Sequence, residues 1–253
     1  MKTTSLKLIL LSAVALVPAL GLAAPQDPES TDPTAAKFAG RTASKPLRVL
    51  LAGSGSSHDF PRFFLGTDAQ TLTATGGMDV AATPNLEEVL TLLPQADVLV
   101  FSGNHDQWGK PEFQKLLNEF ADSGKGLVFV HAATWTHPTW ENYNRRFIAG
   151  ATSSHGKGEF TVTVKNAAHP IMKGVPATFH ITDESYRHEF LEQAKVQVLA
   201  ENTHEGKTHA SIWLTEDPKT KIVNITLGHD DAAHDNAAYK TILINSVNWV
   251  AGR

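Results

Sequence analysis

The sequence predicts an α/β fold with a doubly wound, mostly parallel sheet and added antiparallel strands. Short apolar runs alternate with stretches of helical periodicity as far as residue 130. The apolar runs are continuous, which is typical of parallel strands covered by helices on both faces. The run at residues 160–164 instead alternates polar and apolar side chains, which indicates a half-exposed strand of the antiparallel kind.

The first half of the fold is expected to contain four buried strands and two helices. The strand signals cover residues 47–52, 78–82, 96–101 and 127–130. Apolar side chains at helical spacing predict a helix at residues 86–93 and another that begins at Pro111, since proline is favoured in the first turn of a helix. Gly124 and Gly126 are expected to end this second helix.

The second half is expected to hold shorter strands and a closing helix. The strand-like runs cover residues 160–164, 196–199, 211–214 and 222–227. Residues 237–250 form the predicted helix, with Ile242 and Leu243 on its buried side. The stretches around His155 and Asp183 lack regular periodicity, so we expect them to form loops that wall the edge of the sheet.

The N-terminus has the composition of an export signal. Lysine residues precede an apolar run at residues 8–22, and small residues follow it up to Ala24. This order predicts a signal peptide at residues 1–24, cleaved to leave a periplasmic or secreted protein with no stable membrane insertion. The alternative is an uncleaved membrane anchor, but Pro18 interrupts the run, which is shorter than the ~20 residues that span a bilayer.

The rest of the chain is expected to be a linker followed by one folded domain. Residues 25–45 are rich in Pro, Thr, Ser and Ala, which predicts a flexible linker. Residues 46–253 are expected to form a single α/β domain, because 42% of the chain is hydrophobic and its length suits one core. The net charge is −4, without any dense run of Lys or Arg, which argues against nucleic acid as a partner.

Several kinds of chemistry are disfavoured by residues that the sequence lacks. With no cysteine, the chain can form no disulfide, thiolate metal site or cysteine nucleophile, so an amidotransferase-type hydrolase is a remote alternative. The predicted strand end at residues 130–134 carries no nucleophile elbow of the Gly-x-Ser-x-Gly type. Gly53 and Gly55 lack the third glycine of a dinucleotide fingerprint, and a tight turn explains them.

Histidines follow four of the predicted strands. His58, His105, His131 and His229 come after the first, third, fourth and last of the strong apolar runs. Ligands of open α/β sheets bind beyond the carboxyl ends of the strands. A single histidine at a strand end is more often a packing or surface residue, and the chain has 12 histidines. Four of them at one edge nevertheless predict a concave site, on which we expect the side chains of His131, His155, Asp183, Glu184 and His229 to converge.

Carboxylates and aromatic side chains near these motifs extend the candidate site. Asp183 and Glu184 are adjacent, and such pairs are usually solvated. Near imidazoles, however, they could shift each other's pKa values or bind a divalent metal. Trp135 and Tyr186 could stack on a sugar ring, although a place in the core would also explain them.

A set of motifs occurs in the order found in a known family. The motifs are residues 126–134 (a Gly-rich strand ending in His-Ala-Ala-Thr), His58-Asp59-Phe60, His155, His169-Pro170, Asp183-Glu184-x-Tyr186 and Leu227-Gly228-His229. Through them the chain, from about residue 47 to residue 252, resembles the trehalose-utilisation (ThuA-like) family. The resemblance implies a flavodoxin-like fold of the class I glutamine amidotransferase-like group, without the amidotransferase cysteine, and a link to sugar utilisation. Trp135 stands where the family often has a small or acidic residue.

The resulting hypothesis is an exported carbohydrate-processing enzyme that acts on a sugar or keto-sugar derivative. Its chemistry would be hydrolysis, elimination or isomerisation by histidine and carboxylate acid–base groups. The candidate catalytic residues are His131, His229, Asp183 and Glu184, and the candidate substrate-binding residues are His58, His155, Trp135 and Tyr186. A divalent metal could assist, with His131, His155 and His229 as candidate ligands. The alternative is a non-catalytic sugar-binding module on the same fold, and in both cases the partner is a small-molecule carbohydrate.

Overall fold

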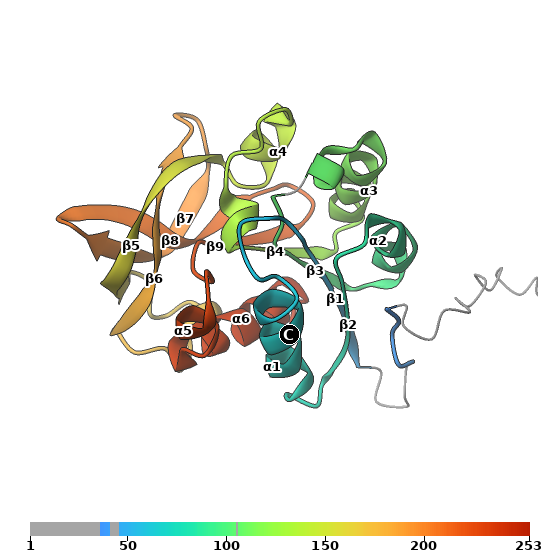
Figure 1. The fold of residues 1–253 in the computed structure, drawn as a ribbon, viewed down its shortest axis with the longest axis horizontal. Helices are drawn as coiled ribbons and strands as arrows, with labels where there is room; N and C mark the ends of the chain where they lie inside the picture. Colours follow the sequence, from blue (N-terminus) through green and yellow to red (C-terminus); the bar gives the residue numbers. More distant parts are fainter. Residues whose placement is uncertain (1–35, 41–45, 105) are drawn as a thin grey trace, which may run out of the picture. The chain divides into compact units, whose positions relative to one another are not determined.

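The computed structural model describes residues 36–40, 46–104 and 106–253 (Figure 1). The predicted signal peptide, most of the predicted linker and the strand-end residue His105 lie outside the described residues. At the end of the predicted linker, the backbone N–H groups of Ala39 and Gly40 donate to the carboxylate of Asp79. No helix among the described residues is long and apolar enough to cross a membrane.

The sheet has nine strands in the order β2-β1-β3-β4-β9-β8-β7-β5-β6. The strands are β1 (Leu47–Ala52), β2 (Met78–Thr83), β3 (Val98–Phe101), β4 (Gly126–Val130), β5 (Gly150–Val164), β6 (Thr178–Phe190), β7 (Val196–His204), β8 (Lys207–Glu216) and β9 (Lys221–Ile225). The strands from β2 to β9 in this order are parallel, and those from β9 to β6 pair antiparallel. The prediction of a mostly parallel sheet therefore holds for one half of the sheet only.

Helices cover both faces of the parallel half (Figure 1). They are α1 (Ala69–Thr73), α2 (Leu86–Leu92), α3 (Pro111–Asp122), α4 (Glu141–Arg146), α5 (Asp231–His234) and α6 (Ala237–Val250), with a short π-helical segment η1 (Phe63–Asp68) and a 3₁₀ turn η4 (His131–Thr134). Val49 and Val128 belong to the core shared with α1 and α6, whereas Leu50 and Leu127 belong to the core shared with α2 and α3. Burial on both faces explains why these strands are continuously apolar.

The predictions for the second half were incomplete. The strand predicted at residues 160–164 is only the end of β5, which begins at Gly150, and β6 was not predicted. His155 lies within β5 and Asp183 within β6, so the prediction of loops at these two residues was wrong. The apolar periodicity was missing because β5 is rich in glycine and polar residues and because β6 buries carboxylates where an ordinary strand buries aliphatic side chains.

Candidate functional site

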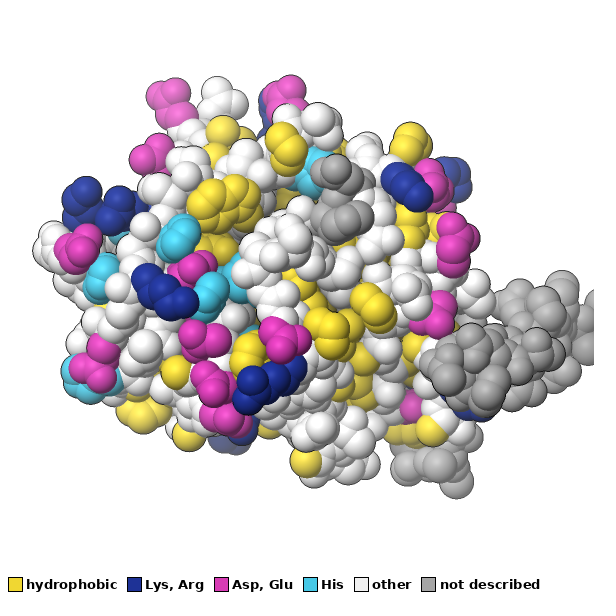
Figure 2. Space-filling model, in the orientation of Figure 1, with side chains coloured by type: hydrophobic (Ala, Val, Ile, Leu, Met, Phe, Trp, Pro, Cys, Tyr) yellow, Lys and Arg dark blue, Asp and Glu magenta, His cyan; other side chains and the backbone are white. Residues whose placement is uncertain are grey.

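Three histidines and one glutamate meet beyond the carboxyl ends of the parallel strands. His58, His131, Glu184 and His229 each offer one ligand atom, and these four atoms lie within 4.8 Å of one another. Nε2 of His131 is 3.0 Å from Nε2 of His58 and 3.5 Å from Oε2 of Glu184, and that oxygen is 3.3 Å from Nδ1 of His229. Figure 2 shows histidine, acidic and basic side chains gathered over β5 and β6. We call these four residues the His/Glu centre.

His131 is held in a fixed orientation at the end of β4. It opens η4 with φ at 42°, a left-handed conformation that costs energy for a residue with a side chain. Its Nδ1 donates to the carbonyl oxygen of Thr226 at 2.6 Å, so Nε2 is the nitrogen that faces the cluster. Burial lowers the pKa of His131 to about 4, and the imidazole is therefore neutral at pH 7.

His229 is positioned through its backbone by a buried carboxylate. The oxygens of Asp183 accept the N–H groups of Gly228 at 2.8 Å and of His229 at 3.1 Å. Burial raises the pKa of Asp183 to about 7, although these N–H groups favour its charged form. Both oxygens of Asp183 are thus engaged by the backbone of the loop after β9, and Asp183 is not one of the four members of the centre.

A second buried network holds the same loop. Nε2 of His234 donates to the carbonyl oxygen of Gly228 at 2.9 Å, and Nδ1 lies 2.8 Å from Oδ1 of Asp68. The hydroxyl of Tyr239 donates to Oδ2 of Asp68 at 2.8 Å. Burial alone would lower the pKa of His234, but the Asp68 carboxylate raises it. No sequence signal marks this network, because its members belong to no motif and meet only in the folded chain.

Glu184 reaches the centre from β6. Burial by itself would raise the pKa of Glu184, but hydrogen bonds with His131, His229 and His58 hold it far below its usual range, so the carboxylate is ionised at neutral pH. Oε2 faces the three histidines, whereas Oε1 lies 3.6 Å from Nδ1 of His155. The His155 side chain is 39% exposed, which places it at the rim of the centre.

The other predicted residues surround the centre. The centroid of the buried Tyr186 ring lies 4.4 Å from that of the His131 ring. The rings of Trp135 and Tyr186 pack edge to face, with their centroids 5.3 Å apart. His58, predicted only as a substrate-binding residue, is a member of the centre itself. Lys157 was not predicted, and its Nζ lies 2.8 Å from Nε2 of His229. No signal pointed to Lys157, because the strand that carries it was predicted to begin only at residue 160.

The donor atoms and their spacing suit a divalent transition-metal ion. Ligand atoms ~2.0–2.1 Å from a tetrahedral metal lie about 3.3 Å from one another. Four of the six distances between donor atoms of the centre measure 3.0, 3.3, 3.5 and 4.0 Å, and all six are at most 4.8 Å. Among the described residues, no regular hydrogen bond reaches the buried Nδ1 of His229, although Oε2 of Glu184 lies 3.3 Å away. Imidazoles with one carboxylate are ligands that Zn²⁺ and related ions accept, and the outer hydrogen bond of His131 is typical of a metal ligand.

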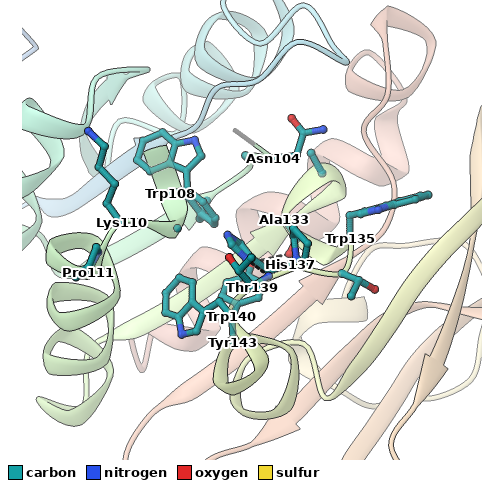
Figure 3. A pocket seen from close by; sticks show the side chains of 16 residues that line it. Asn104, Trp108, Lys110, Pro111, Ala133, Trp135, His137, Thr139, Trp140 and Tyr143 are labelled. Carbon is teal, nitrogen blue, oxygen red and sulfur yellow. Dashed lines mark hydrogen bonds between the residues drawn. The ribbon is translucent and has the colours of Figure 1, made fainter. Parts of the chain in front are cut away.

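Two hollows of very different size lie at this edge of the sheet. A hollow of about 10 Å³ is lined by His58, His131 and His229, among others, and has about the room that one ion or water needs. A second hollow, of about 700 Å³, is lined by aromatic side chains and by Ala133 and Trp135, which follow His131 along the chain (Figure 3).

Comparison with known proteins finds a family and a set of solved structures. The family model described as "ThuA: Trehalose utilisation" matches residues 64–250. No curated protein matches the sequence significantly.

The similar structures share the fold at low sequence identity. A ThuA-like protein from Parabacteroides merdae is 19% identical, with a TM-score of 0.71 over 82% of this chain and 90% of that chain. A ThuA-like protein from Bacteroides uniformis is 18% identical, with a TM-score of 0.68 over 85% of this chain and 95% of that chain. PurLQS from Thermotoga maritima is 11% identical, with a TM-score of 0.54 over 81% of this chain and 99% of that chain.

Proposed function

This chain belongs to the ThuA (trehalose utilisation) family, with its glutamine amidotransferase-like fold, and we propose that it is a metal-assisted enzyme that processes a sugar or keto-sugar derivative. The observation that carries the proposal is the His/Glu centre, in which three imidazoles and one carboxylate converge. Gathering polar side chains in a largely buried place costs stability, and such departures from ordinary packing occur mainly where a function requires them.

The protonation states of two members support the binding of a cation. His131 offers a neutral nitrogen at pH 7, because burial lowers its pKa to about 4, and Glu184 offers an ionised oxygen. Metal binding through Nδ1 of His229 would place the proton of that ring on Nε2. The ammonium of Lys157 would then turn from this nitrogen toward the carboxylate of Asp230, which is 4.0 Å away.

The proposed chemistry divides between the cation and the chain. A divalent cation in the centre supplies Lewis acidity toward a carbonyl or hydroxyl oxygen of the sugar. His155, at the exposed rim and 3.6 Å from Glu184, can exchange protons with water and serves as the acid–base group for hydrolysis, elimination or isomerisation. Asp183, predicted as catalytic, instead serves to position the backbone of His229.

The composition of residues 1–24 supports the proposal that the protein is exported to the periplasm or the medium.

The second candidate function is a non-catalytic sugar-binding module, because an aromatic-lined hollow suffices to bind a sugar without any chemistry.

The proposal is tested by measuring the turnover of a panel of glycosides and keto-glycosides by protein that has been stripped with a chelator and then reloaded with Zn²⁺ or Mn²⁺. We expect activity only in a reloaded form, and a loss of about 10²–10⁴-fold in kcat/KM for His229→Ala. His180→Ala is the matched control, because this histidine is exposed on the same strand as Glu184. His131→Ala is a poorer test, since that ring is buried and its loss should also destabilise the fold.

Two results would contradict the proposal. Undiminished turnover by chelator-treated protein would remove the role of the metal. Sugar binding without turnover by any metal-loaded form would favour the binding module instead.

A further inference from the structure

The hollow of about 700 Å³ is separate from the His/Glu centre. None of the four members of the centre is among the described residues that line it. Its volume falls in the range of ~300–1,000 Å³ that small-molecule sites occupy. The hollow is therefore a candidate binding site of its own, which the chemistry proposed for the centre does not use.

The wall of the hollow contains aromatic rings that hold one another in place (Figure 3). The ring centroids of Trp140 and Tyr143 are 5.0 Å apart, and the ring of His137 packs edge to face on Trp140 at 5.7 Å. The fully buried Phe113 packs on both Trp108 and Trp140. Because packed rings keep their positions, this aromatic surface is formed before any ligand binds.

Several polar atoms of this wall are engaged within the protein. Nε1 of Trp108 donates to a backbone carbonyl oxygen at 3.3 Å, and the hydroxyls of Tyr143 and Thr136 donate to others at 2.5 and 2.8 Å. A sugar, the occupant under the second candidate function, needs hydrogen-bond partners around its hydroxyl rim. A flat aromatic ring needs only the faces and edges of other rings. The lining therefore suits an aromatic ring better than a polyol.

The charge of the lining favours an acidic group on such a ring. Among the described residues that line the hollow, Lys110 carries the one permanent charge, and none has a carboxylate. Lys110 and Trp135 lie at opposite sides of the hollow in Figure 3. The ammonium of the exposed Lys110 sits on a flexible four-carbon stem and can follow an anionic group at the rim. Water screens this attraction, so the aromatic contacts supply most of the affinity and Lys110 selects the sign of the charge.

We infer that this hollow binds a flat aromatic compound that carries an acidic group, such as an aromatic carboxylate. The ring lies among the aromatic side chains of the wall, and the carboxylate lies toward Lys110. The inference goes beyond the proposed function, because it uses no member of the His/Glu centre and holds with or without a metal there.

The test is calorimetric titration of the whole protein with indole-3-acetate, with its neutral analogue indole-3-acetamide and with glucose. We expect the acid to bind about two- to fivefold more tightly than the amide, as an exposed ion pair allows, and glucose to bind most weakly. Lys110→Gln should remove the difference between the two indoles. Lys115→Gln is the matched control, because this exposed lysine on α3 pairs with Glu119 and does not line the hollow.

Further variants test where the ring binds. Trp135→Ala should weaken the binding of both indoles by roughly tenfold, through lost aromatic contact. Thr139→Trp, which fills the hollow from an exposed position, should do the same without removing a core contact. Trp249→Ala is the control, since this indole is half-buried as Trp135 is but does not line the hollow. His229→Ala should keep both affinities, whereas a carboxylate bound by a metal at the centre would depend on that histidine.

The inference is overturned if the two indoles bind equally, if Lys110→Gln keeps their difference, or if Trp135→Ala and Thr139→Trp both keep the wild-type affinities. Glucose that binds more tightly than either indole, and is lost in both of these variants, would overturn it in favour of the sugar-binding module. Titration with ZnCl₂ reports on the centre alone. A wild type that takes no zinc but binds indole-3-acetate as expected would contradict the metal-assisted function and support this inference.

Discussion

Each histidine of the centre has an outer contact, and for His131 and His58 this contact selects the nitrogen that faces inward. A backbone carbonyl binds Nδ1 of His131, Oγ of Ser57 binds Nδ1 of His58, and Nζ of Lys157 lies next to Nε2 of His229. Outer hydrogen bonds of this kind typically change metal affinity by about 10–100-fold. The chain therefore fixes Nε2 of His131 and Nε2 of His58 as the inward nitrogens before any cation binds, whereas the contact between Lys157 and Nε2 of His229 must open when Nδ1 binds a cation.

The buried network behind the loop of His229 leads to a prediction on stability. Tyr239→Phe should lower the free energy of unfolding by about 1.5–3 kcal/mol, because it removes a hydrogen bond to the Asp68 carboxylate, which is fully buried and paired with His234. Urea unfolding followed by circular dichroism would measure this loss.

Tyr143→Phe provides the control for that prediction. The hydroxyl of Tyr143 is equally buried but donates to a neutral acceptor, the carbonyl oxygen of Ala133, at 2.5 Å. Its removal should cost only about 0.5–1.5 kcal/mol. An equal or larger loss for Tyr143→Phe would contradict the stronger hydrogen bond that we assign to Tyr239 and Asp68.

On the scale of secondary structure, strands buried on both faces were predictable and the strands of the site were not. The observed bounds of β1 are the predicted ones, because a strand covered by helices on both sides is an unbroken apolar run. In β6 the consecutive residues Asp183, Glu184 and Ser185 are all buried, which no hydrophobic pattern can indicate. In β5 a Cβ on Gly156 would lie 2.5 Å from Nδ1 of His204, so this glycine reflects a close approach within the sheet and not a loop.

His188 on β6 gives a prediction on pH. Its Nε2 donates to the carbonyl oxygen of Ile148, and burial lowers the pKa of His188 to about 4. In the unfolded chain this histidine becomes protonated as the pH falls below about 6.5, whereas in the folded chain it stays neutral until about pH 4. Its contribution to the free energy of unfolding is therefore lost as the pH falls from 6.5 to 4. The loss should reach about 3 kcal/mol at pH 4.

Urea unfolding at pH 7 and pH 4 would test this for His188→Gln. Between pH 7 and pH 4, the free energy of unfolding of the variant should fall by about 3 kcal/mol less than that of the wild type. His180→Gln, at an exposed position of the same strand, should behave as the wild type does. If the free energy of unfolding falls by the same amount in the wild type and in His188→Gln, another group controls acid unfolding.

On the scale of the whole molecule, the His/Glu centre forms because the antiparallel half of the sheet lies over the carboxyl ends of the parallel strands. β6 is four positions from β9 in the sheet, yet Asp183 on β6 accepts the N–H group of Gly228 just after β9. The sheet therefore curls back on itself and delivers Glu184 to the histidines at the strand ends.

The strand pattern of the sequence could place the histidine half of the centre only, whereas Glu184 was a candidate from its pairing with Asp183 and from the order of the motifs. His58, His131 and His229 follow strands that share one edge of a parallel sheet, so apolar runs and a topological rule suffice to bring them together. The order β8-β7-β5-β6, which brings Glu184 to the same place, results from long-range pairing that leaves no local signal.

Anomalous diffraction would show whether the His/Glu centre holds a divalent cation. Data would be collected on both sides of the zinc absorption edge from crystals of protein incubated with ZnCl₂. We expect an anomalous peak ~2.0–2.2 Å from Nε2 of His58, Nε2 of His131, Nδ1 of His229 and an oxygen of Glu184. Zinc found only at other surface residues, with the four side chains of the centre still in contact with one another, would contradict it.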